Sequence, residues 1–325
     1  MRPGHARGRT PDDLRLAQRA YAGDRSALNA SVHLLHRALR STVHLRSDVP
    51  PTHASAAILG TERMGAGTVV DPLGVVLTAH YMVIGARSVE VTSTDGTVLP
   101  GTVVGIDYAT GLAAVRVEGA RLPGLRIRPA SADLVGEEAF VIASVGDGRR
   151  VSSGVLTSYA PFEAFWEYML DHAITASAPS PGLGGGPLID ALGRMLGVVS
   201  LSLAEVGKFT LAVPAAEARP MLDAIERSGR YATAAPRAWI GITCYPIGRS
   251  VIVAAVLPES PAEAAEIASG DVIEAVDGVE VTDRRSLYSA IWSRAPGRTV
   301  RVRVGRAGES LEIAVEASSI ESFFA

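Results

Sequence analysis

The clearest chemical signal in the sequence is a glycine-rich segment near the middle of the chain, Gly182–Leu188, which reads GLGGGPL. A tight glycine turn that runs into an apolar strand can direct its backbone N–H groups at one point, where they stabilise a developing oxyanion. Acyl transfer at such a turn also requires a nucleophile and a base that is held in place by a third group. The turn contains no serine, threonine or cysteine, so the sequence shows the frame of this chemistry without its nucleophile.

The same glycines could also form a phosphate-binding loop, but the neighbouring sequence does not favour one. No lysine follows them, Pro187 occupies the last glycine place of a GxGxxG match, and the next element is predicted to be a strand instead of a helix. We therefore expect no nucleotide at this segment.

Metal and disulfide chemistry find little support in the sequence. The single cysteine, Cys244, excludes an intramolecular disulfide and a cysteine cluster, and we expect it to be a small buried apolar residue. His33 and His36 would lie one helical turn apart, but no third ligand is close in sequence. The sequence predicts neither a metal site nor a cofactor.

Length and composition indicate a globular chain of two domains. The 325 residues are 47% hydrophobic, and the 31 basic and 34 acidic side chains leave a net charge of −3, which does not favour nucleic acid as a partner. The first 30 residues lack the apolar run of about 7 to 15 residues of a signal peptide. No stretch reaches the roughly 18 apolar residues of a membrane-spanning helix, so we expect a cytoplasmic location.

The hydrophobic pattern divides the chain into four parts. Residues 1–40 are predicted to form a basic helical arm, in which a solvated face explains the charges better than membrane binding does. Short apolar runs separated by turn signals fill residues 41–228 and indicate a β-barrel or β-sandwich, closed by a helix over residues 215–228. Residues 229–238 have the composition of a linker.

The last part, residues 239–317, is expected to be a compact module of strands and two helices. A short helix begins at Pro261 and ends near Gly270, and a hairpin turns at Asp277-Gly278. A second helix is predicted over residues 283–293, followed by two alternating strands.

Several separated stretches resemble the HtrA/Deg family, which joins a trypsin-like double β-barrel to a PDZ domain. Residues 65–71 (GAGTVVD) are similar to that family's GSGVIID, residues 74–86 to its GYILTNAHVVAGA, and residues 107–115 (DYATGLAAV) to its DPxTDLAVL. The order of these landmarks, which continues through residues 151–158, 209–214 and 239–278, covers residues 41–317. The resemblance implies a mainly β fold with a trypsin-like double barrel and a C-terminal PDZ domain.

The resemblance places the catalytic triad on three residues that cannot perform its chemistry. The family's serine falls on Gly184 of GLGGGPL, its histidine on Tyr81, and its aspartate on Gly111. A tyrosine, with an ordinary pKa of about 10, is a poor base at neutral pH, and two glycines supply neither attack nor orientation. Gly182, Leu183 and Gly184 would then form a vestigial oxyanion loop.

Displaced residues could restore the chemistry, and we keep this as the alternative. His80 precedes Tyr81 by one place, and Ser180 and Ser177 precede Gly184 by four and seven places. At about 3.3 Å per extended residue these serines lie well beyond the roughly 3 Å contact of a nucleophile with its base. For His80, Asp107, Ser177 and Ser180 we favour structural roles.

In the C-terminal module the resemblance implies a peptide-binding groove. The carboxylate loop would be Trp239-Ile240-Gly241-Ile242, and Leu287 and Ile291 would line the side-chain pocket. PDZ domains add a peptide as a strand at a sheet edge and hold its carboxylate with main-chain N–H groups. The chain departs from the family's AGLxxGD at Glu266, where the family has glycine, which puts the local turn in doubt.

The sequence therefore predicts a catalytically inactive HtrA-like pseudoprotease that binds polypeptides or protein C-termini through its PDZ domain, in a scaffold, chaperone-like or quality-control role. The alternative is an active serine endopeptidase with a displaced triad. A structural subunit is a third possibility, since the resemblance implies a homotrimer. The resemblance also implies the cell envelope as an alternative location.

Overall fold

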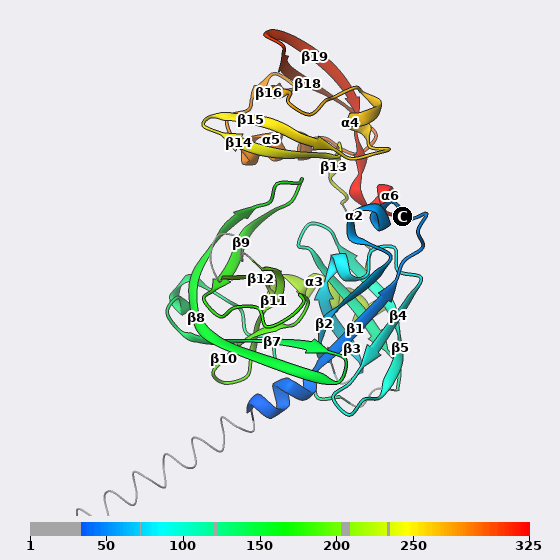
Figure 1. The fold of residues 1–325 in the computed structure, drawn as a ribbon, viewed down its shortest axis with the longest axis vertical. Coiled ribbons are helices and arrows are strands. Elements are labelled where there is room, and N and C mark those ends of the chain that lie inside the picture. Colours follow the sequence, from blue (N-terminus) through cyan, green and yellow to red (C-terminus); the bar gives the residue numbers. More distant parts are fainter. Residues whose placement is uncertain (1–33, 72, 120–121, 203–208, 233–234) are drawn as a thin grey trace, which may run out of the picture.

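The structure is a computed structural model that describes residues 34–71, 73–119, 122–202, 209–232 and 235–325. Two closed six-stranded β-barrels lie side by side, and a smaller C-terminal domain lies against one end of the pair (Figure 1). The predicted mainly β fold with a trypsin-like double barrel and a PDZ domain is confirmed. The predicted arm before residue 34, including His33 of the histidine pair, lies outside the described residues.

The first barrel has the strand order β1-β2-β3-β6-β5-β4, with β1 paired to β4 to close it. Closure leaves no free sheet edge, so each strand buries its apolar face inside the barrel. Its strands are β1 (Thr42–Asp48), β2 (Glu62–Asp71), β3 (Val75–Ala79), β4 (Ser88–Thr92), β5 (Val98–Asp107) and β6 (Leu112–Val117). Two short helices, α2 (Ala54–Leu59) and the 3₁₀ helix η1 (His80–Met82), interrupt the strand sequence.

The second barrel has the same design, with the order β10-β11-β12-β9-β8-β7. Its strands are β7 (Glu138–Val145), β8 (Gly148–Glu163), β9 (Met169–Ala176), β10 (Pro187–Asp190), β11 (Met195–Ser202) and β12 (Thr210–Pro214). The 3₁₀ helix η2 (Ala132–Leu134) precedes this barrel, and η3 (Ala215–Ala218) with α3 (Arg219–Ser228) follows it, as the sequence predicted. One buried apolar cluster contains residues of both barrels, among them Leu77, Leu112, Ile142 and Leu211.

Residues 34–41 form a helix that packs onto the barrels. Ala38 is fully buried and belongs to the apolar cluster shared by the two barrels. Arg37 donates a hydrogen bond to the Gly124 carbonyl (3.0 Å). The last turns of the predicted arm are therefore part of the folded domain. No helix among the described residues is long and apolar enough to cross a membrane.

The C-terminal domain is a sheet of order β14-β15-β16-β18-β19, with β17 paired to β16. Its elements are β13 (Ala238–Trp239), β14 (Ile242–Ile247), β15 (Ser250–Val256), α4 (Pro261–Ala264), β16 (Val272–Val276), β17 (Val279–Glu280), α5 (Arg284–Trp292), β18 (Thr299–Arg306), β19 (Glu309–Glu316), β20 (Ser318–Ser319) and α6 (Ile320–Phe323). The hairpin at Asp277-Gly278 forms as predicted, with φ of 47° and 82°, the double positive φ of a type I′ turn. Strand β13 pairs with β20, which joins the two ends of the domain.

The helix expected to run from Pro261 to near Gly270 ends at Ala264, so the prediction was too long. The backbone reverses at Glu266, whose φ is +60°. The N–H of Ile267 donates to the Ala262 carbonyl (3.0 Å) and closes the helix end. The turn that glycine normally makes is thus formed by glutamate, in a conformation that costs an L-residue about 1–2 kcal/mol.

Replacing Glu266 with glycine should stabilise this domain. Glu266→Gly removes the left-handed strain of about 1–2 kcal/mol. Glycine also makes the unfolded chain more flexible, which costs the folded state about 0.5–1 kcal/mol. We therefore expect the free energy of unfolding to rise by about 0.5–1 kcal/mol. Urea unfolding followed by tryptophan fluorescence measures the change. The matched control is Gly270→Ala, at φ +94° in open space, which should lose about 1 kcal/mol. A loss of stability in Glu266→Gly would contradict the account.

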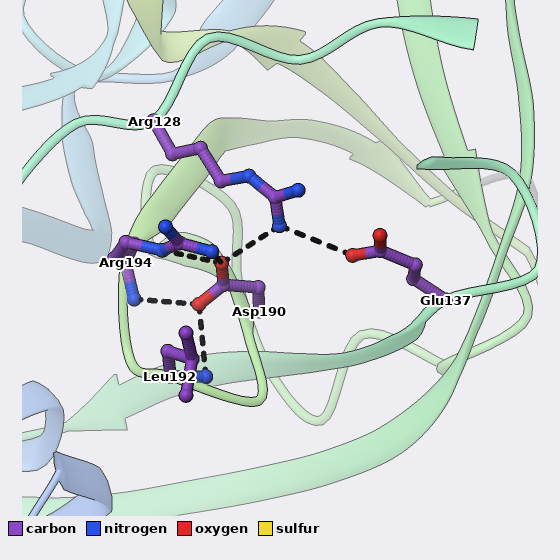
Figure 2. Close-up of polar contacts among 5 residues, drawn as sticks. All are labelled: Arg128, Glu137, Asp190, Leu192 and Arg194. Carbon is purple, nitrogen blue, oxygen red and sulfur yellow. Dashed lines mark hydrogen bonds and ion pairs between the residues drawn. The ribbon is translucent and has the colours of Figure 1, made fainter. Parts of the chain in front are cut away.

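A buried carboxylate fixes the turn that follows the glycine-rich segment (Figure 2). Asp190, at the end of β10, is 3% exposed and accepts hydrogen bonds from the backbone N–H groups of Leu192 (3.0 Å) and Arg194 (2.9 Å). Its other oxygen contacts Arg128 (3.0 Å) and the Arg194 guanidinium (2.7 Å). Burial alone would raise the pKa of Asp190, but the bonds from Arg194 and Arg128 hold this pKa below its ordinary value.

Removing this carboxylate should unfold the turn. Asp190→Ala removes the acceptor of two backbone N–H groups and of the Arg128 and Arg194 guanidinium groups, and we expect a loss of about 2–3 kcal/mol in the free energy of unfolding. Because the pKa is lowered in the folded state, the contribution is present above pH 4 and is lost as the pH falls further. The control Glu137→Ala breaks only the exposed pair with Arg128 (3.1 Å) and should cost less than about 1 kcal/mol. Equal losses for the two variants, by urea unfolding, would refute this role.

Candidate functional site

The first candidate site lies where the two barrels meet, and the structure brings Tyr81 and Gly184 into contact there. Tyr81 is part of η1, directly after β3, and its hydroxyl donates a hydrogen bond to the Ser200 carbonyl (2.7 Å). The phenol oxygen lies so close to Gly184 that a Cβ atom at position 184 would collide with it. Burial raises the pKa of Tyr81 to about 12. The phenol is therefore a neutral hydrogen-bond donor at physiological pH.

Gly111 lies on the turn between β5 and β6, next to η1. Its carbonyl accepts a hydrogen bond from the backbone N–H of His80 (2.9 Å), the residue before Tyr81. The space that a side chain at position 111 would enter is occupied by the hydroxyl of Tyr168, which donates to the Thr110 carbonyl (2.7 Å). The three residues that the motifs single out thus gather around η1, with two tyrosine hydroxyls filling the space.

The segment Gly182–Leu188 is fastened to both barrels through its backbone. The Gly184 carbonyl accepts from Ala66 of β2 (2.9 Å), and the Gly185 N–H donates to Val199 of β11 (2.7 Å). Gly185 has a φ of +90°, and a Cβ atom there would strike the Ala66 carbonyl. The close approach of this segment to β2 and β11 thus requires glycine whether or not the loop holds an oxyanion.

Among the described residues, no hydrogen bond joins His80 to Ser177, Ser180 or Asp107. His80 contacts the rings of Tyr81, Tyr108 and Tyr168 at centroid distances of 6.2, 5.8 and 6.4 Å. Its Nδ1 atom is buried and has no hydrogen-bond partner among the described residues. Burial lowers the pKa of His80 to about 4, which makes it a weak base.

The side chains of the candidate serines and of Asp107 form hydrogen bonds with backbone groups. The Ser180 hydroxyl donates to the Gly182 carbonyl (2.9 Å), and the Ser177 hydroxyl accepts from the N–H of Val155 (3.0 Å). Asp107 accepts from the N–H of Ala109 (3.0 Å), as turn aspartates do. Each of the three side chains is thus engaged in a hydrogen bond with a backbone group.

One histidine does meet a serine hydroxyl, at a place that sequence reasoning passed over. His53 Nδ1 lies 2.8 Å from Ser55 Oγ at the start of α2, where His53 caps the helix. Ser55 is fully buried, and its hydroxyl also accepts from Arg63 (2.7 Å). His53 Nε2 contacts the Phe324 carbonyl (3.2 Å) instead of a carboxylate. A buried hydroxyl beside a guanidinium cannot reach a substrate, so we assign this pair to helix capping.

The second candidate site is the loop before β14, which closes around a carboxylate of the chain itself. The backbone N–H groups of Ile240, Gly241 and Ile242 donate to Oε1 of Glu167 at 3.2, 2.8 and 3.2 Å. The N–H of Ile240 also lies 3.3 Å from Oε2. Glu167 belongs to the connection between β8 and β9 of the second barrel, and Figure 1 shows this hairpin reaching toward the C-terminal domain.

The residues before Glu167 lie along β14. The Cys244 N–H donates to the Phe165 carbonyl (2.6 Å), and Trp166 forms an antiparallel bridge with Thr243. Cys244 is fully buried as expected, and burial raises the pKa of its thiol to about 12. Leu287 and Ile291 of α5 are fully buried in the apolar cluster of this domain, against which Met169 of the barrel also packs.

Glu167 is the residue of this candidate site that sequence reasoning missed. It is 7% exposed, and burial raises the pKa of its carboxyl group to about 7 against the opposing effect of the N–H groups of Gly241, Ile242 and Ile240. A raised folded-state pKa means that this contact is strongest at acidic pH and weakens as the pH rises through 7. The available signal was residues 161–169, PFEAFWEYM, an aromatic-rich stretch in a chain that is 5% aromatic.

Comparisons with known proteins agree with this two-domain arrangement. The model of the trypsin-like peptidase domain matches residues 65–198, and that of the PDZ domain matches residues 238–317. A probable periplasmic DegP-like serine endoprotease of Chlamydia trachomatis is 29% identical over 272 residues, which cover 79% of this chain and 54% of that protein. Over both domains the chain is thus similar to DegP-like proteases of the HtrA type. It spans about half the length of this relative.

Further relatives extend the comparison. The putative serine protease HhoA of Synechocystis is 27% identical over 284 residues, covering 79% of this chain and 71% of its own. Among solved structures, the HtrA-type protease AlgW with a decapeptide covers 89% of this chain and 98% of its own, with a TM-score of 0.54 and 21% identity. The serine endoprotease from Yersinia pestis gives the same TM-score at 22% identity. These structures establish the HtrA/DegP fold.

The contact between Tyr81 and Gly184 can be measured by a double-mutant cycle. Gly184→Ala should cost about 1–3 kcal/mol because the new methyl group strikes the Tyr81 hydroxyl. In a Tyr81→Phe background that hydroxyl is gone, and we expect the cost of Gly184→Ala to fall by about 1 kcal/mol. Urea unfolding of the four proteins gives the coupling energy. The control background is Tyr159→Phe, whose ring stacks on His172. A coupling no larger than that of the control would contradict the contact.

Proposed function

We propose that this HtrA/DegP homologue is proteolytically inactive and binds polypeptide C-termini through its PDZ domain, in a scaffold, chaperone-like or quality-control role. The observation that carries the proposal is the contact of Tyr81 with Gly184. The motifs assign the catalytic base and nucleophile to these two residues, and the structure brings them together without an imidazole or a side-chain nucleophile. The bonded phenol occupies the volume in which a serine would have to turn.

The chemistry supports an inactive site at each step. Acyl transfer needs a hydroxyl or thiol whose proton passes to a base of near-neutral pKa. Tyr81, with a pKa near 12, keeps its proton and directs it at the Ser200 carbonyl. Gly111 supplies no carboxylate, and Tyr168 fills the space in which one would lie.

The alternative of an active endopeptidase with a displaced triad has less support. It would require His80 to contact Ser177 or Ser180, and each serine hydroxyl instead forms a hydrogen bond with a backbone group. His53 and Ser55 do form a pair, but Ser55 is fully buried. The cytoplasmic location, the cell-envelope alternative and the homotrimer stay predictions.

The assay for this function is proteolysis with covalent labelling. The purified full chain should neither cleave casein nor react with a fluorophosphonate probe, because both require an activated serine. An active HtrA-type protease serves as the positive control under the same conditions. Cleavage that copurifies with the chain and is abolished by His80→Ala or Ser180→Ala would establish the displaced triad. Cleavage that Ser55→Ala abolishes would identify the capped pair as catalytic.

A further inference from the structure

The edge strand β14 of the PDZ domain is covered by the chain's own β8–β9 connection. Within the sheet, strand β14 pairs only with β15, so the backbone N–H and C=O groups of its other edge are available to another segment. Phe165 accepts the hydrogen bond of the Cys244 N–H (2.6 Å), and Trp166 bridges Thr243 in antiparallel direction. This is strand addition, the way in which a PDZ domain takes up a peptide.

A carboxylate fills the anion-binding loop at the end of this added strand. Oε1 of Glu167 receives three backbone N–H groups within 3.2 Å, from Ile240, Gly241 and Ile242. A peptide C-terminus would present the same group, two oxygens of unit negative charge, to the same donors. The side chain of Glu167 thus reproduces the chemistry of a chain terminus inside a continuous chain.

The side chains next to Glu167 also contact the groove as those of a bound peptide would. The Phe165 ring packs against Tyr245 (4.8 Å between centroids) and lies 5.3 Å from the guanidinium of Arg284 at the start of α5. Glu163 forms an ion pair with Arg285 of the same helix (3.1 Å). The segment therefore contacts both walls of the groove, β14 and α5.

The Ala164 carbonyl adds a further contact by accepting the hydroxyl of Tyr288 in α5 (3.1 Å). Ala164 itself is 3% exposed. In contrast, Phe165 is 49% exposed and Trp166 is 38% exposed. The segment is thus anchored at its ends, by residue 164 and by Glu167, while its middle faces solvent.

The interaction is costly for a permanent domain interface. Among the described residues no cation pairs with Glu167, so backbone N–H groups alone compensate a buried carboxyl group. Burying such a group opposes docking, and its pKa near 7 reflects that cost. A contact of this kind can be exchanged for a ligand that brings an equivalent carboxylate and further strand pairing.

We propose that Glu163–Met169 is a built-in ligand of the PDZ groove, and that a polypeptide C-terminus binds by displacing it. The inference rests on the peptide binding of the proposed function and adds its regulation. A tethered segment competes at an effective concentration on the order of mM. The apparent affinity for an external peptide is reduced by the fraction of molecules whose groove is open.

The test measures peptide affinity in the full chain. The probe is a fluorescent peptide that copies residues 161–166 and ends in valine with a free carboxylate, and its matched control has an amidated end. Glu167→Ala should bind the carboxylate peptide at least about tenfold more tightly than the unmodified chain. Glu167→Gln, which conserves size, should shift in the same direction. Every one of these proteins should bind the amidated peptide more weakly than the carboxylate peptide, because the loop of Ile240–Ile242 then receives no carboxylate.

A substitution elsewhere on the surface serves as the control, because it shows whether any loss of a glutamate changes the peptide affinity. Glu138→Ala changes an exposed residue of β7 and should leave the affinity unchanged. Equal affinity in the unmodified chain and both Glu167 variants would overturn the built-in ligand while leaving peptide binding intact. No binding of the carboxylate peptide by any of these proteins would overturn the peptide binding of the proposed function and this inference with it.

Hydrogen exchange tests the displacement without any substitution. Saturating carboxylate peptide should speed the exchange of backbone amides over residues 163–169 in the unmodified chain, because the segment leaves the groove. The amidated peptide should not. Unchanged or slower exchange over residues 163–169 with peptide bound would overturn the proposal.

Discussion

The volume between the two barrels admits either a phenol or a side chain on the glycine segment, and this constraint governs the rest of the site. Tyr81 bonds to the Ser200 carbonyl across the junction, and Gly184 has no Cβ atom that would obstruct it. The hydrogen bond joins η1 of the first barrel to β11 of the second. The residues that the motifs assign to catalysis therefore contribute to packing between the barrels, because protein interiors leave no room for an unused side chain.

In the PDZ domain, too, a residue of the chain itself occupies the candidate site. A loop suited to a chain terminus holds Glu167 of the barrel, and the groove beside it holds Ala164 and Phe165. Each candidate site is thus filled by a residue of the chain: a tyrosine hydroxyl in one and a glutamate carboxylate in the other. We propose that the second of these contacts is reversible, whereas the first belongs to the packing between the two barrels.

Sequence alone predicted those features that local rules determine. The Asp277-Gly278 hairpin follows from turn chemistry, and the helix over residues 283–293 follows from its apolar spacing and is capped by Asp283. The end of α4 was misjudged because Glu266 adopts a left-handed conformation that a glutamate rarely takes. The contact of Glu167 with Gly241 joins residues 74 positions apart, and no periodic pattern encodes such a pairing.

Isotope exchange tests the central claim, that the site retains no acyl-transfer chemistry, most directly. Serine proteases incorporate oxygen from ¹⁸O-labelled water into the terminal carboxylate of bound peptides, because the acyl-enzyme forms and hydrolyses repeatedly. Mass spectrometry of a peptide incubated with the full chain in such water detects this exchange even where net cleavage is slow. The account predicts incorporation equal to that of buffer alone. Incorporation that rises in proportion to protein concentration and disappears in His80→Ala would contradict it.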